Sequence, residues 1–553
     1  MQFESLQRLA ALSAARGIHQ AVISPGSRSA LIAVAFSRHP DIHVEVVNDE
    51  RSAAYIAIGM AQTLGQPVVL ICTSGTAALN YGPAVAEARF QQIPLLILTA
   101  DRPPQFLGRD DGQMIYQDDL YGRHVKYFTS LPVYMARDKI QTIQDKFTTA
   151  VNHVFNRPAG PVHCNIPIAE PFYPEIDALQ KDQPKFEAIQ NVIPDQPADD
   201  TWTGRLQHYR KILILIARQE PNRQLQNALT GIKNIPMIVE CTSNIFGHPS
   251  SVPFPDIFFR NYKSHDYQDY RPDLLITVGS QIISRPLKTV IRSWSDFDHW
   301  HIQPAGDPAD VFFSDPELIA AEPEVFFSIL AENLPPVDKV YFQRWQKEAV
   351  MIHDRLDNQW QTDTAWNEYM VTRQLVVHLL DETVLHLGNS MPVRWANLCA
   401  IPPGIAVYSN RGTSGIDGVL STAVGQALAD NRQHVVLIGD ISFFYDRNAL
   451  WLKSIPENLR IIVLNNGGGG IFSLIDGPSR LPELQELFVT YQTASVRSLA
   501  DEYGIPYRCV TRRSDCKAAM AWITEARKEC RIMEAKVAVR ENQRIYQNLM
   551  EMD

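Results

Sequence analysis

The sequence lacks the features of several large classes of protein. Lys and Arg number 51 against 61 Asp and Glu, a net charge of −10, which argues against a general nucleic-acid or anionic-membrane binder. No apolar run approaches the roughly 20 residues that span a bilayer. The first residues, MQFESLQRLAALSAARG, have no basic segment followed by a long apolar stretch, as a signal peptide would. We therefore expect a soluble, cytoplasmic protein with no transmembrane segment and no nucleic-acid partner.

Cysteine and the common nucleotide-binding motifs are also scarce. The seven cysteines are scattered, odd in number and form no C-x-x-C pair, which argues against a zinc centre or a disulfide framework and suits reduced thiols. The sequence has no G-x-x-x-x-G-K-[ST] loop and no G-x-G-x-x-G fingerprint that opens a helix after a strand. Their absence argues against an ordinary nucleotide-binding α/β protein.

What the sequence does contain is a repeated alternation of strand-like and helix-like segments. Short apolar runs, such as VVLIC at 68–72 and KILILIA at 211–217, have the length and aliphatic content of strands buried on both faces of a parallel sheet. Segments with helical spacing of apolar residues lie between such runs, at 53–64, 77–91 and 366–380. This alternation predicts an α/β fold of doubly wound parallel sheets.

The alternation falls into three blocks. The 553 residues correspond to about three domains at roughly 100–200 residues each. We expect domains at 1–180, 190–340 and 355–553, with the proline-rich segment 167–190 as the first linker. Their similar sizes predict three related α/β units.

The loops that follow the predicted strands are unusually rich in polar residues. Ligands of parallel sheets bind at the carboxyl ends of the strands, so these loops carry the functional information. Strand-to-helix turns favour Gly, Ser, Asn and Asp in any case, which accounts for the small residues. It does not account for the arginines that occur in SPGSRS, TADRPP, GNSMPVR and SNRG as well as in NDER.

Two of these loops predict a metal site. Asp440 follows one strand in GDIS, and Asn466 follows the next in NNGGGG, 26 positions later. Their oxygens, with the backbone carbonyl of Gly468, form the kind of set that Mg²⁺ takes, completed by diphosphate oxygens and water. The glycine run lets the backbone approach a ligand closely. The spacing resembles the thiamin diphosphate motif, GDG followed about 25 residues later by NN, although Ile441 stands where the wider superfamily has Gly.

Glu50 is the second chemical signal. It follows the strand-like VEVV and precedes a helix-like segment, and a glutamate at a helix N-terminus is favourable through the helix dipole alone. Thiamin diphosphate enzymes also place a glutamate in this context, where it hydrogen-bonds the aminopyrimidine ring and activates the cofactor. With the GD and NN loops in the other half of the chain, we favour catalysis.

Several longer motifs together carry a family resemblance. They are SPGSRSA, NDERSAA, TSGTAALNYGPAVAEA, LTADRPP, SNRGTSGIDG, GDISFFYDRNAL and NNGGGGIF. In this order they resemble the thiamin diphosphate-dependent 2-succinyl-5-enolpyruvyl-6-hydroxy-3-cyclohexene-1-carboxylate synthase family of menaquinone biosynthesis. That family has an apolar residue and then Ser after GD, as Ile441 and Ser442 stand here. The motifs cover the first and third blocks, and the middle block matches weakly.

The resemblance implies an enzyme, a transferase that forms a carbon–carbon bond. It would decarboxylate 2-oxoglutarate and add the resulting succinyl carbanion to isochorismate in a 1,4 fashion, with thiamin diphosphate and Mg²⁺ or Mn²⁺ as cofactors. Both substrates are dicarboxylates, and arginine pairs bidentately with carboxylates. The loop arginines would therefore bind the substrate carboxylates. The alternative is another thiamin diphosphate-dependent 2-oxoacid decarboxylase or an acetohydroxyacid-synthase-like enzyme, which would need fewer arginines.

The resemblance also implies a role for each matched residue. Glu50 would be catalytic, and the substrate carboxylates would be bound by Ser27, Arg28, Arg102, Gln113, Arg285, Ser390, Arg394 and Arg411. The cofactor would be held by Glu50, Ser390, Ile416, Gly439, Asp440, Ile441, Ser442, Asn466, Gly468, Gly470, Ile471 and Phe472. Asp440, Asn466 and the carbonyl of Gly468 would bind the metal, and Ile416 would prop the bent cofactor.

Two implications go beyond single motifs. Arg285 stands where the family often has a lysine, with Lys288 nearby, and Arg and Lys are not interchangeable at a tight site. The first block would be the pyrimidine-binding domain, the second a Rossmann-like central domain and the third the diphosphate-binding domain. In the family, active sites lie at subunit interfaces, which implies a homodimer or homotetramer.

Overall fold

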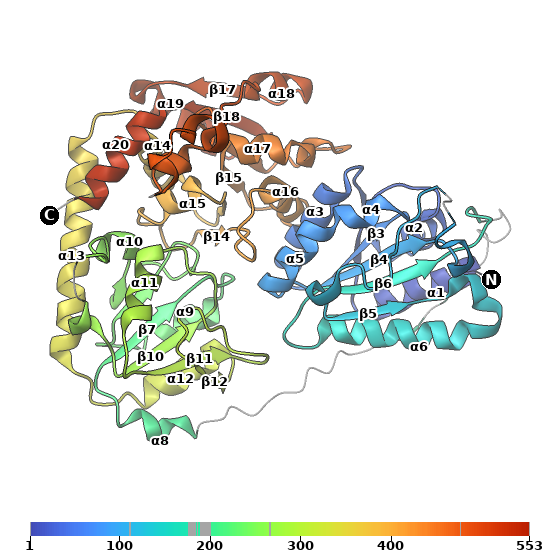
Figure 1. Ribbon diagram of the computed structural model, residues 1–553, viewed down its shortest axis with the longest axis horizontal. Coiled ribbons are helices and arrows are strands. Elements are labelled where there is room, and N and C mark those ends of the chain that lie inside the picture. Colours follow the sequence, from blue (N-terminus) through green and yellow to red (C-terminus); the bar gives the residue numbers. More distant parts are fainter. Residues whose placement is uncertain are drawn as a thin grey trace. The chain divides into compact units, whose positions relative to one another are not determined.

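The computed structural model describes residues 2–109, 112–174, 184, 186–188, 201–264, 267–475 and 477–551. They form three six-stranded sheets covered by helices (Figure 1), and the strand pairs are parallel. The predicted α/β fold class is therefore confirmed. Most of the predicted linker at 167–190 lies outside the described residues. No helix of the described ranges is long and apolar enough to cross a bilayer.

The first sheet has the strand order β2-β1-β3-β4-β6-β5. Its strands are β1 (Gln20–Ile23), β2 (His43–Val46), β3 (Val68–Cys72), β4 (Leu95–Asp101), β5 (Tyr127–Ser130) and β6 (Val162–Pro167). Its helices are α1 (Gln2–Ala15), α2 (Ala30–Ser37), α3 (Glu50–Leu64), α4 (Thr76–Asn80), α5 (Gly82–Gln91) and α6 (Ala136–Phe155), with the short 3-10 helices η1 (Pro104–Phe106), η2 (Gly122–His124) and η3 (Val133–Met135).

The central sheet has the order β12-β11-β10-β7-β8-β9. Its strands are β7 (Ile212–Ile216), β8 (Met237–Val239), β9 (Ser251–Val252), β10 (Leu274–Val278), β11 (Asp298–Gln303) and β12 (Glu317–Ala320). Its helices are α8 (Trp202–Leu206), α9 (Arg223–Leu229), α10 (Pro255–Phe258), α11 (Arg285–Ser293) and α12 (Pro323–Glu332), with the turn η4 (Gln268–Tyr270); α13 (Lys339–Thr362) follows.

The third sheet has the order β14-β13-β15-β16-β18-β17. Its strands are β13 (Val384–Leu387), β14 (Ala406–Tyr408), β15 (His434–Gly439), β16 (Leu459–Asn465), β17 (Tyr507–Val510) and β18 (Arg531–Lys536). The helices in this part of the chain are α14 (Glu368–His378), α15 (Met391–Ala396), α16 (Val419–Ala429), α17 (Asp440–Tyr445), α18 (Val496–Glu502), α19 (Arg513–Thr524) and α20 (Val539–Met550), with η5 (Arg447–Leu450), η6 (Gly470–Ser473), η7 (Pro478–Arg480) and η8 (Leu484–Val489).

The strand orders show how the three sheets are related. The first and third sheets share one order when their strands are counted along the chain, whereas the central sheet has the 3-2-1-4-5-6 order of Rossmann sheets. All three sheets are α/β units as predicted, and the central one differs from the other two in strand order. The described chain separates into two compact units, and the predicted domain bounds stay a prediction. One unit holds the described residues of 1–194, 410–431 and 445–459, and the other holds the remaining described residues.

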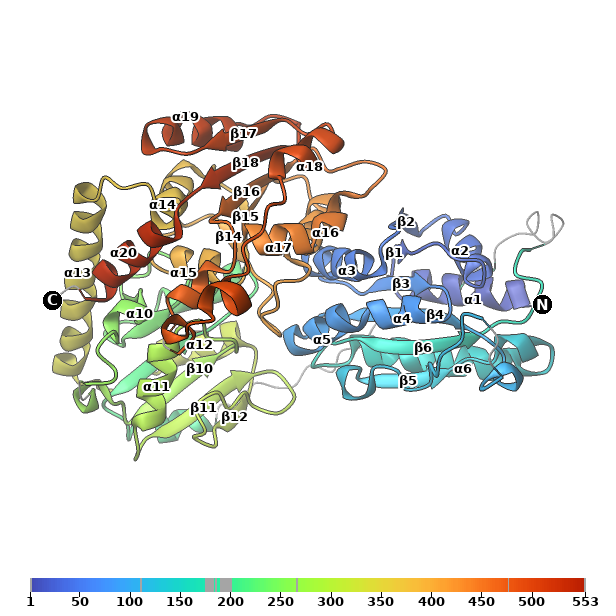
Figure 2. The ribbon, with the colours of Figure 1, turned by 45° about the horizontal axis from the view of Figure 1, so that its top comes forward.

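The first unit is built around the first sheet. All side chains of β3 and β4 are buried, as expected for strands covered on both faces, and α6 packs along β5 and β6 (Figure 2). The helix predicted at 53–64 is α3, and Asp49 caps it by accepting a hydrogen bond from Ser52 N. The single helix predicted at 77–91 is two, α4 and α5. Pro83 cannot donate a backbone hydrogen bond within a helix, so it stands in the first turn of a new one.

Helices α3 and α16 cross in close contact within the same unit. A Cβ added at Gly425 would lie 2.0 Å from the carbonyl oxygen of Ile56, and one added at Gly59 would lie 2.0 Å from that of Thr422. The two backbones can approach this closely because both contact positions are glycine. The crossing fixes α16 and the loop before it onto the first sheet's helices.

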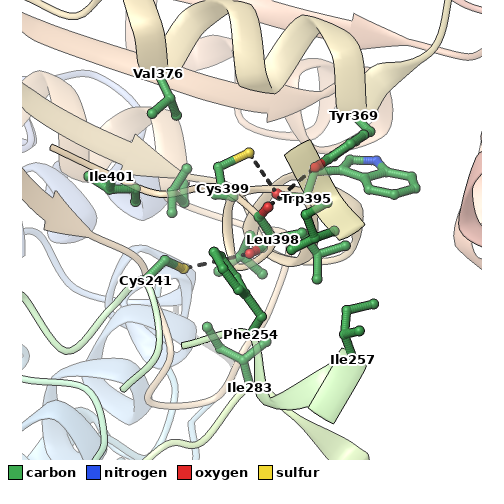
Figure 3. Packing of buried hydrophobic residues seen from close by; sticks show 14 of the residues in the cluster. Cys241, Phe254, Ile257, Ile283, Tyr369, Val376, Trp395, Leu398, Cys399 and Ile401 are labelled. Atoms are coloured by element: carbon green, nitrogen blue, oxygen red, sulfur yellow. Dashed lines mark hydrogen bonds between the residues drawn. The ribbon is translucent and has the colours of Figure 1, made fainter. Parts of the chain in front are cut away.

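The second unit holds the central and third sheets on one continuous apolar core. The long helix α13 runs beside both sheets in this unit (Figure 1), and α19 covers β17 and β18 (Figure 2). Figure 3 shows part of the core: Trp395 and Leu398 pack near Phe254, Ile257 and Ile283 from the central block. This packing anchors α15 against the central block.

Candidate active site

Asp440 and Asn466 lie at the same edge of the third sheet. Asp440 begins α17 directly after β15, and Asn466 follows β16, which neighbours β15. The Asp440 carboxylate is buried. Its pKa is raised to about 6, chiefly by burial and also by the charge of Glu368, against a hydrogen bond from Gln492 that lowers it. Gln492 Nε2 donates that bond at 3.0 Å. Burial of an acid disfavours its ionised form unless a positive partner is present, so this carboxylate suits a cation.

Asn466 is held on both sides. Its Nδ2 donates to Glu368 Oε1 at 2.8 Å, and its Oδ1 accepts from Gly468 N at 3.2 Å. Glu368 lies in the first turn of α14 and also accepts a 2.8 Å hydrogen bond from Trp395 Nε1. The charge of Glu368 raises the pKa of Asp440, and its carboxylate accepts a hydrogen bond from Asn466. The three side chains therefore lie in one neighbourhood.

The glycine run after Asn466 has a packing reason as well as the predicted ligand-binding one. A Cβ at Gly468 would lie 2.6 Å from the carbonyl oxygen of Val489, and one at Gly470 would lie 2.7 Å from Asn466 Nδ2. Side chains at these positions would displace the Asn466 amide and the 488–489 backbone. The glycine run therefore leaves the backbone beside Asp440 and Asn466 uncovered by side chains of its own.

A cavity of about 440 Å³ adjoins this edge of the sheet. It is lined by Asn465, Gly467, Gln492, Thr493, Ala494, Lys536, Val537 and Ala538. The buried Oε1 of Gln492 has no hydrogen-bond partner in the described part of the chain. The cavity therefore gives a ligand access to the side chain that holds Asp440.

The donors at this edge fit a hard divalent cation. The carboxylate of Asp440, Oδ1 of Asn466 and the carbonyl of Gly468 are all oxygens, the ligand type that Mg²⁺ takes. The Gly468 carbonyl also accepts from Gly470 N at 2.9 Å. Within the described ranges, no three His, Cys, Asp or Glu side chains gather as a metal site. A cation here would thus need further oxygens from a ligand or water.

Ser390 and Arg394 lie on the next strand-to-helix connection, after β13. Ser390 precedes α15 with φ 73°, a left-handed conformation that non-glycine residues adopt only where the surroundings impose it. Arg394 Nη1 donates to the Ser390 carbonyl at 2.5 Å. The buried core around Trp395 anchors α15, which carries Arg394 and begins directly after Ser390 (Figure 3).

The predicted cation of the central block is less well defined. Arg285 is exposed at the first position of α11. Lys288 donates to the carbonyl of Ile282 at 3.2 Å. Burial raises the pKa of Asp256, while the positive charges of Arg394 and Lys288 lower it. Lys288 and Arg394 therefore share a neighbourhood, and the role of Arg285 stays a prediction.

In the first unit, Glu50 begins α3 and is half-buried. Burial raises the pKa of the Cys72 thiol, and the Glu50 charge raises it further, which places the carboxylate near the end of β3. Because Asp49 supplies the cap, the Glu50 side chain is not required to begin the helix.

The predicted carboxylate binders of the first unit follow β1 and β4. Arg28 is buried, donates to the carbonyl of Ile168 at 2.8 Å and stacks 4.4 Å over the Phe172 ring, while Ser27 is exposed. Arg102 donates to the carbonyl of Gly112, beside Gln113, which is exposed with φ 56°. Each loop thus presents polar groups at the carboxyl edge of the first sheet.

The loop that carries Arg411 and Ile416 is held by a residue that the sequence did not single out. The buried carboxylate of Glu87 accepts hydrogen bonds from Gly412 N at 2.7 Å and from both the backbone N and Oγ1 of Thr413 at 2.6 Å. Tyr55 donates to Asp417 at 3.0 Å on the other side of the loop. Arg411 is buried and Ile416 half-buried.

Comparison with known proteins identifies the family. A synthase from Cytophaga hutchinsonii, 2-succinyl-5-enolpyruvyl-6-hydroxy-3-cyclohexene-1-carboxylate synthase, is 40% identical over 502 residues, 89% of this chain and 88% of that protein. The chain belongs to that synthase family. A synthase of the same name from Flavobacterium psychrophilum is 34% identical over 497 residues, with 89% of this chain and 88% of that protein covered.

Two further comparisons concern the fold. Residues 6–121 match the family model described as "Thiamine pyrophosphate enzyme, N-terminal TPP binding domain". Benzoylformate decarboxylase from Polynucleobacter necessarius superimposes with a TM-score of 0.71 over 97% of this chain and 98% of that chain, at 16% identity. The family resemblance predicted from the sequence is therefore confirmed, while the roles of individual synthase residues stay predictions.

Proposed function

We propose that the protein decarboxylates 2-oxoglutarate and adds the four-carbon unit to isochorismate, giving 2-succinyl-5-enolpyruvyl-6-hydroxy-3-cyclohexene-1-carboxylate and CO₂ in menaquinone biosynthesis. The observation that carries the proposal is the identity of 40% across nearly the full length of a synthase of that name. The likeness to benzoylformate decarboxylase, at 16% identity, supports the fold and does not favour the alternative 2-oxoacid decarboxylase.

The cofactors in this proposal are thiamin diphosphate and Mg²⁺, or Mn²⁺ in its place. Bound thiamin diphosphate would supply the carbon nucleophile and the electron sink that decarboxylation of a 2-oxoacid requires. Asp440, Asn466 and the Gly468 carbonyl would hold the metal on the diphosphate, supported by their shared sheet edge. Ile416, Ile471 and Phe472 would form the apolar walls, and Gly439, Ile441, Ser442, Gly470 and Ser390 would line the cofactor.

Glu50 would act on the aminopyrimidine ring. Its carboxyl group would hydrogen-bond that ring and so hold the proton needed to activate the cofactor. The proposal is supported by the position of Glu50 at a strand-to-helix junction that does not need it as a cap. No histidine takes an acid–base role in this account.

The arginines would bind the substrate carboxylates and exclude monocarboxylic oxoacids. Arg28 and Arg102 with Ser27 and Gln113 would serve in the first unit, together with Arg411. Arg394 with Ser390 would serve in the second, along with Arg285 or Lys288. Planar guanidinium groups pair bidentately with carboxylates and lose little entropy in doing so. A homodimer or homotetramer with active sites at subunit interfaces, and a cytoplasmic location, stay predictions.

Product analysis tests the proposal. The purified protein would be incubated with thiamin diphosphate, Mg²⁺, isochorismate and one oxoacid: 2-oxoglutarate, pyruvate or benzoylformate. We expect the mass of the succinyl adduct with 2-oxoglutarate and no adduct with the two monocarboxylic acids. Products from pyruvate or benzoylformate at comparable rates would favour the alternative decarboxylase.

A further inference from the structure

We propose that Glu368 is a positioning residue that decides which end of the Asn466 amide is offered to the cation. The inference deepens the proposed function and rests on it, since it takes Asn466 as a metal ligand. Glu368 lies 98 positions before Asn466, outside every motif of the sequence analysis, and reaches the site from the first turn of α14.

Glu368 is itself held firmly. The residue is 1% exposed, and its Oε2 accepts from the indole Nε1 of Trp395 at 2.8 Å. Its backbone N donates to Asn542 Oδ1 at 2.9 Å. An indole N–H can only donate, so one carboxylate oxygen is committed to Trp395. The other oxygen, Oε1, is left to face Asn466.

The orientation of an asparagine amide is not set by its shape. The oxygen and the NH₂ group are nearly the same size, so only hydrogen bonding distinguishes the two orientations. On one side of Asn466 stands Glu368 Oε1, an acceptor, and on the other side stands the backbone N–H of Gly468, a donor. A single orientation satisfies both, with Nδ2 toward Glu368 and Oδ1 toward Gly468.

That orientation matters because only the oxygen can bind a cation. Oδ1 stays on the side of Gly468, whose carbonyl is the third proposed ligand, and an amide oxygen can accept from an N–H while it binds a metal. The reverse orientation would bring NH₂ against the Gly468 N–H and present no donor atom to the cation. A glutamine at 368 would permit that reversal, because its NH₂ group can donate to Oδ1 of Asn466. A carboxylate at 368 cannot donate to Oδ1 and so does not permit the reversal. This accounts for an acid at position 368, although burial of a carboxylate is by itself unfavourable.

The test is Mn²⁺ binding, monitored by electron paramagnetic resonance of the full-length protein in the presence of thiamin diphosphate. Loss of a group that orients a metal ligand typically weakens affinity about 10–100-fold, and we expect Glu368→Gln to weaken Mn²⁺ binding within that range. The reciprocal variant Glu368→Gln with Asn466→Asp exchanges donor and acceptor across the same contact. The carboxylate that Asn466→Asp introduces offers an oxygen in either orientation, so the double variant should regain most of the lost affinity.

Trp395→Phe is the matched control. It removes the other hydrogen bond to the Glu368 carboxylate and leaves the contact with Asn466 in place. We expect a lower melting temperature and unchanged Mn²⁺ affinity. If Glu368→Gln alone does not fold, the test compares the melting temperature of Asn466→Asp with that of the double variant. Asn466→Asp alone sets two carboxylates against each other, so adding Glu368→Gln must raise its melting temperature.

The outcomes separate this inference from the proposed function. Wild-type Mn²⁺ affinity in Glu368→Gln, or no recovery in the double variant, overturns the positioning role. Asn466→Ala that binds Mn²⁺ as tightly as the wild type overturns the metal assignment as well. A weakened Asn466→Ala beside an unaffected Glu368→Gln leaves the proposed metal site standing and removes only Glu368 from it.

Discussion

Glu87 and Thr413 lie 326 positions apart in the chain, and the carboxylate of the first accepts 2.6 Å hydrogen bonds from both the backbone N and the hydroxyl of the second. Gln91 Nε2 donates to the same carboxylate. One buried acid from the helices of the first sheet therefore holds the loop that carries Arg411 and Ile416.

Glu87→Gln should loosen that loop. A glutamine has one acceptor oxygen and cannot serve all of these donors, and a buried donor left unpaired costs about 1–3 kcal/mol. We expect a lower melting temperature and, since Arg411 is proposed to bind a substrate carboxylate, a higher KM with a smaller change in kcat. Glu4→Gln is the control, because Glu4 pairs with Arg8 on the surface and such pairs contribute little. Equal KM values in wild type and Glu87→Gln would remove Glu87 from the site.

Gly425→Ala should disrupt the crossing of α3 and α16. The new Cβ would meet a backbone carbonyl at 2.0 Å, and overpacking of this kind costs roughly 1–3 kcal/mol or more. Gly82→Ala is the matched control, since nothing lies within 4 Å of its Cβ and alanine is favoured in a helix by up to about 1 kcal/mol. Thermal unfolding compares them. A Gly425→Ala variant as stable as Gly82→Ala would contradict the close helix contact.

The contribution of Asp446 to the stability of the cofactor-free protein should fall as pH rises toward 7. Burial raises the pKa of Asp446 to about 7, against hydrogen bonds from Ser421 that lower it. Between about pH 4 and pH 7 the folded chain therefore keeps a proton that the unfolded chain has released. This contribution is full below pH 4 and is lost with a slope of up to about 1.4 kcal/mol per pH unit.

Asp446→Asn should flatten that dependence. An amide can accept from Ser421 N and donate to Ser421 Oγ, which replaces both hydrogen bonds of the carboxylate. Melting temperatures of wild type and variant would be compared from pH 4 to pH 7. The two curves should converge at low pH and separate at neutral pH in favour of the variant. Parallel curves would show that Asp446 does not titrate in this interval.

Glu50→Gln should abolish turnover while the fold survives. General acid–base groups typically contribute about 10²–10⁴-fold to rate, so we expect a loss in kcat of at least that size. The melting temperature should be unchanged because Asp49 caps α3. Glu45→Gln, five positions earlier on β2 and paired with His43 at 3.0 Å, should keep full activity. Appreciable turnover by Glu50→Gln would end the catalytic assignment.

The sequence predicted those features that are local in the chain. Buried parallel strands appear as short aliphatic runs, and the loops after them carry the polar residues, so Asp440 and Asn466 could be placed at one edge. The break between α4 and α5 was missed, although Gly82 and Pro83 signal it. No local pattern indicates the different strand order of the central sheet, since strand order depends on how distant segments pair; only the family resemblance, which implies a Rossmann-like central domain, pointed to it.

The supporting residues of the site could not be predicted for the same reason. Glu87, Glu368 and Gln492 resemble ordinary polar residues of helices and loops in the sequence. Their contacts with Thr413, Asn466 and Asp440 join segments 326, 98 and 52 positions apart. Only the fold shows that these three hold the loops the motifs identify.

Release of CO₂ from 2-oxoglutarate tests the central claim most directly. The purified protein would be supplied with thiamin diphosphate and Mg²⁺, with or without isochorismate. The account predicts release that requires the cofactor and is strongly accelerated by isochorismate. Rapid release without isochorismate would contradict it in favour of a simple decarboxylase, and no release under either condition would refute the substrate assignments.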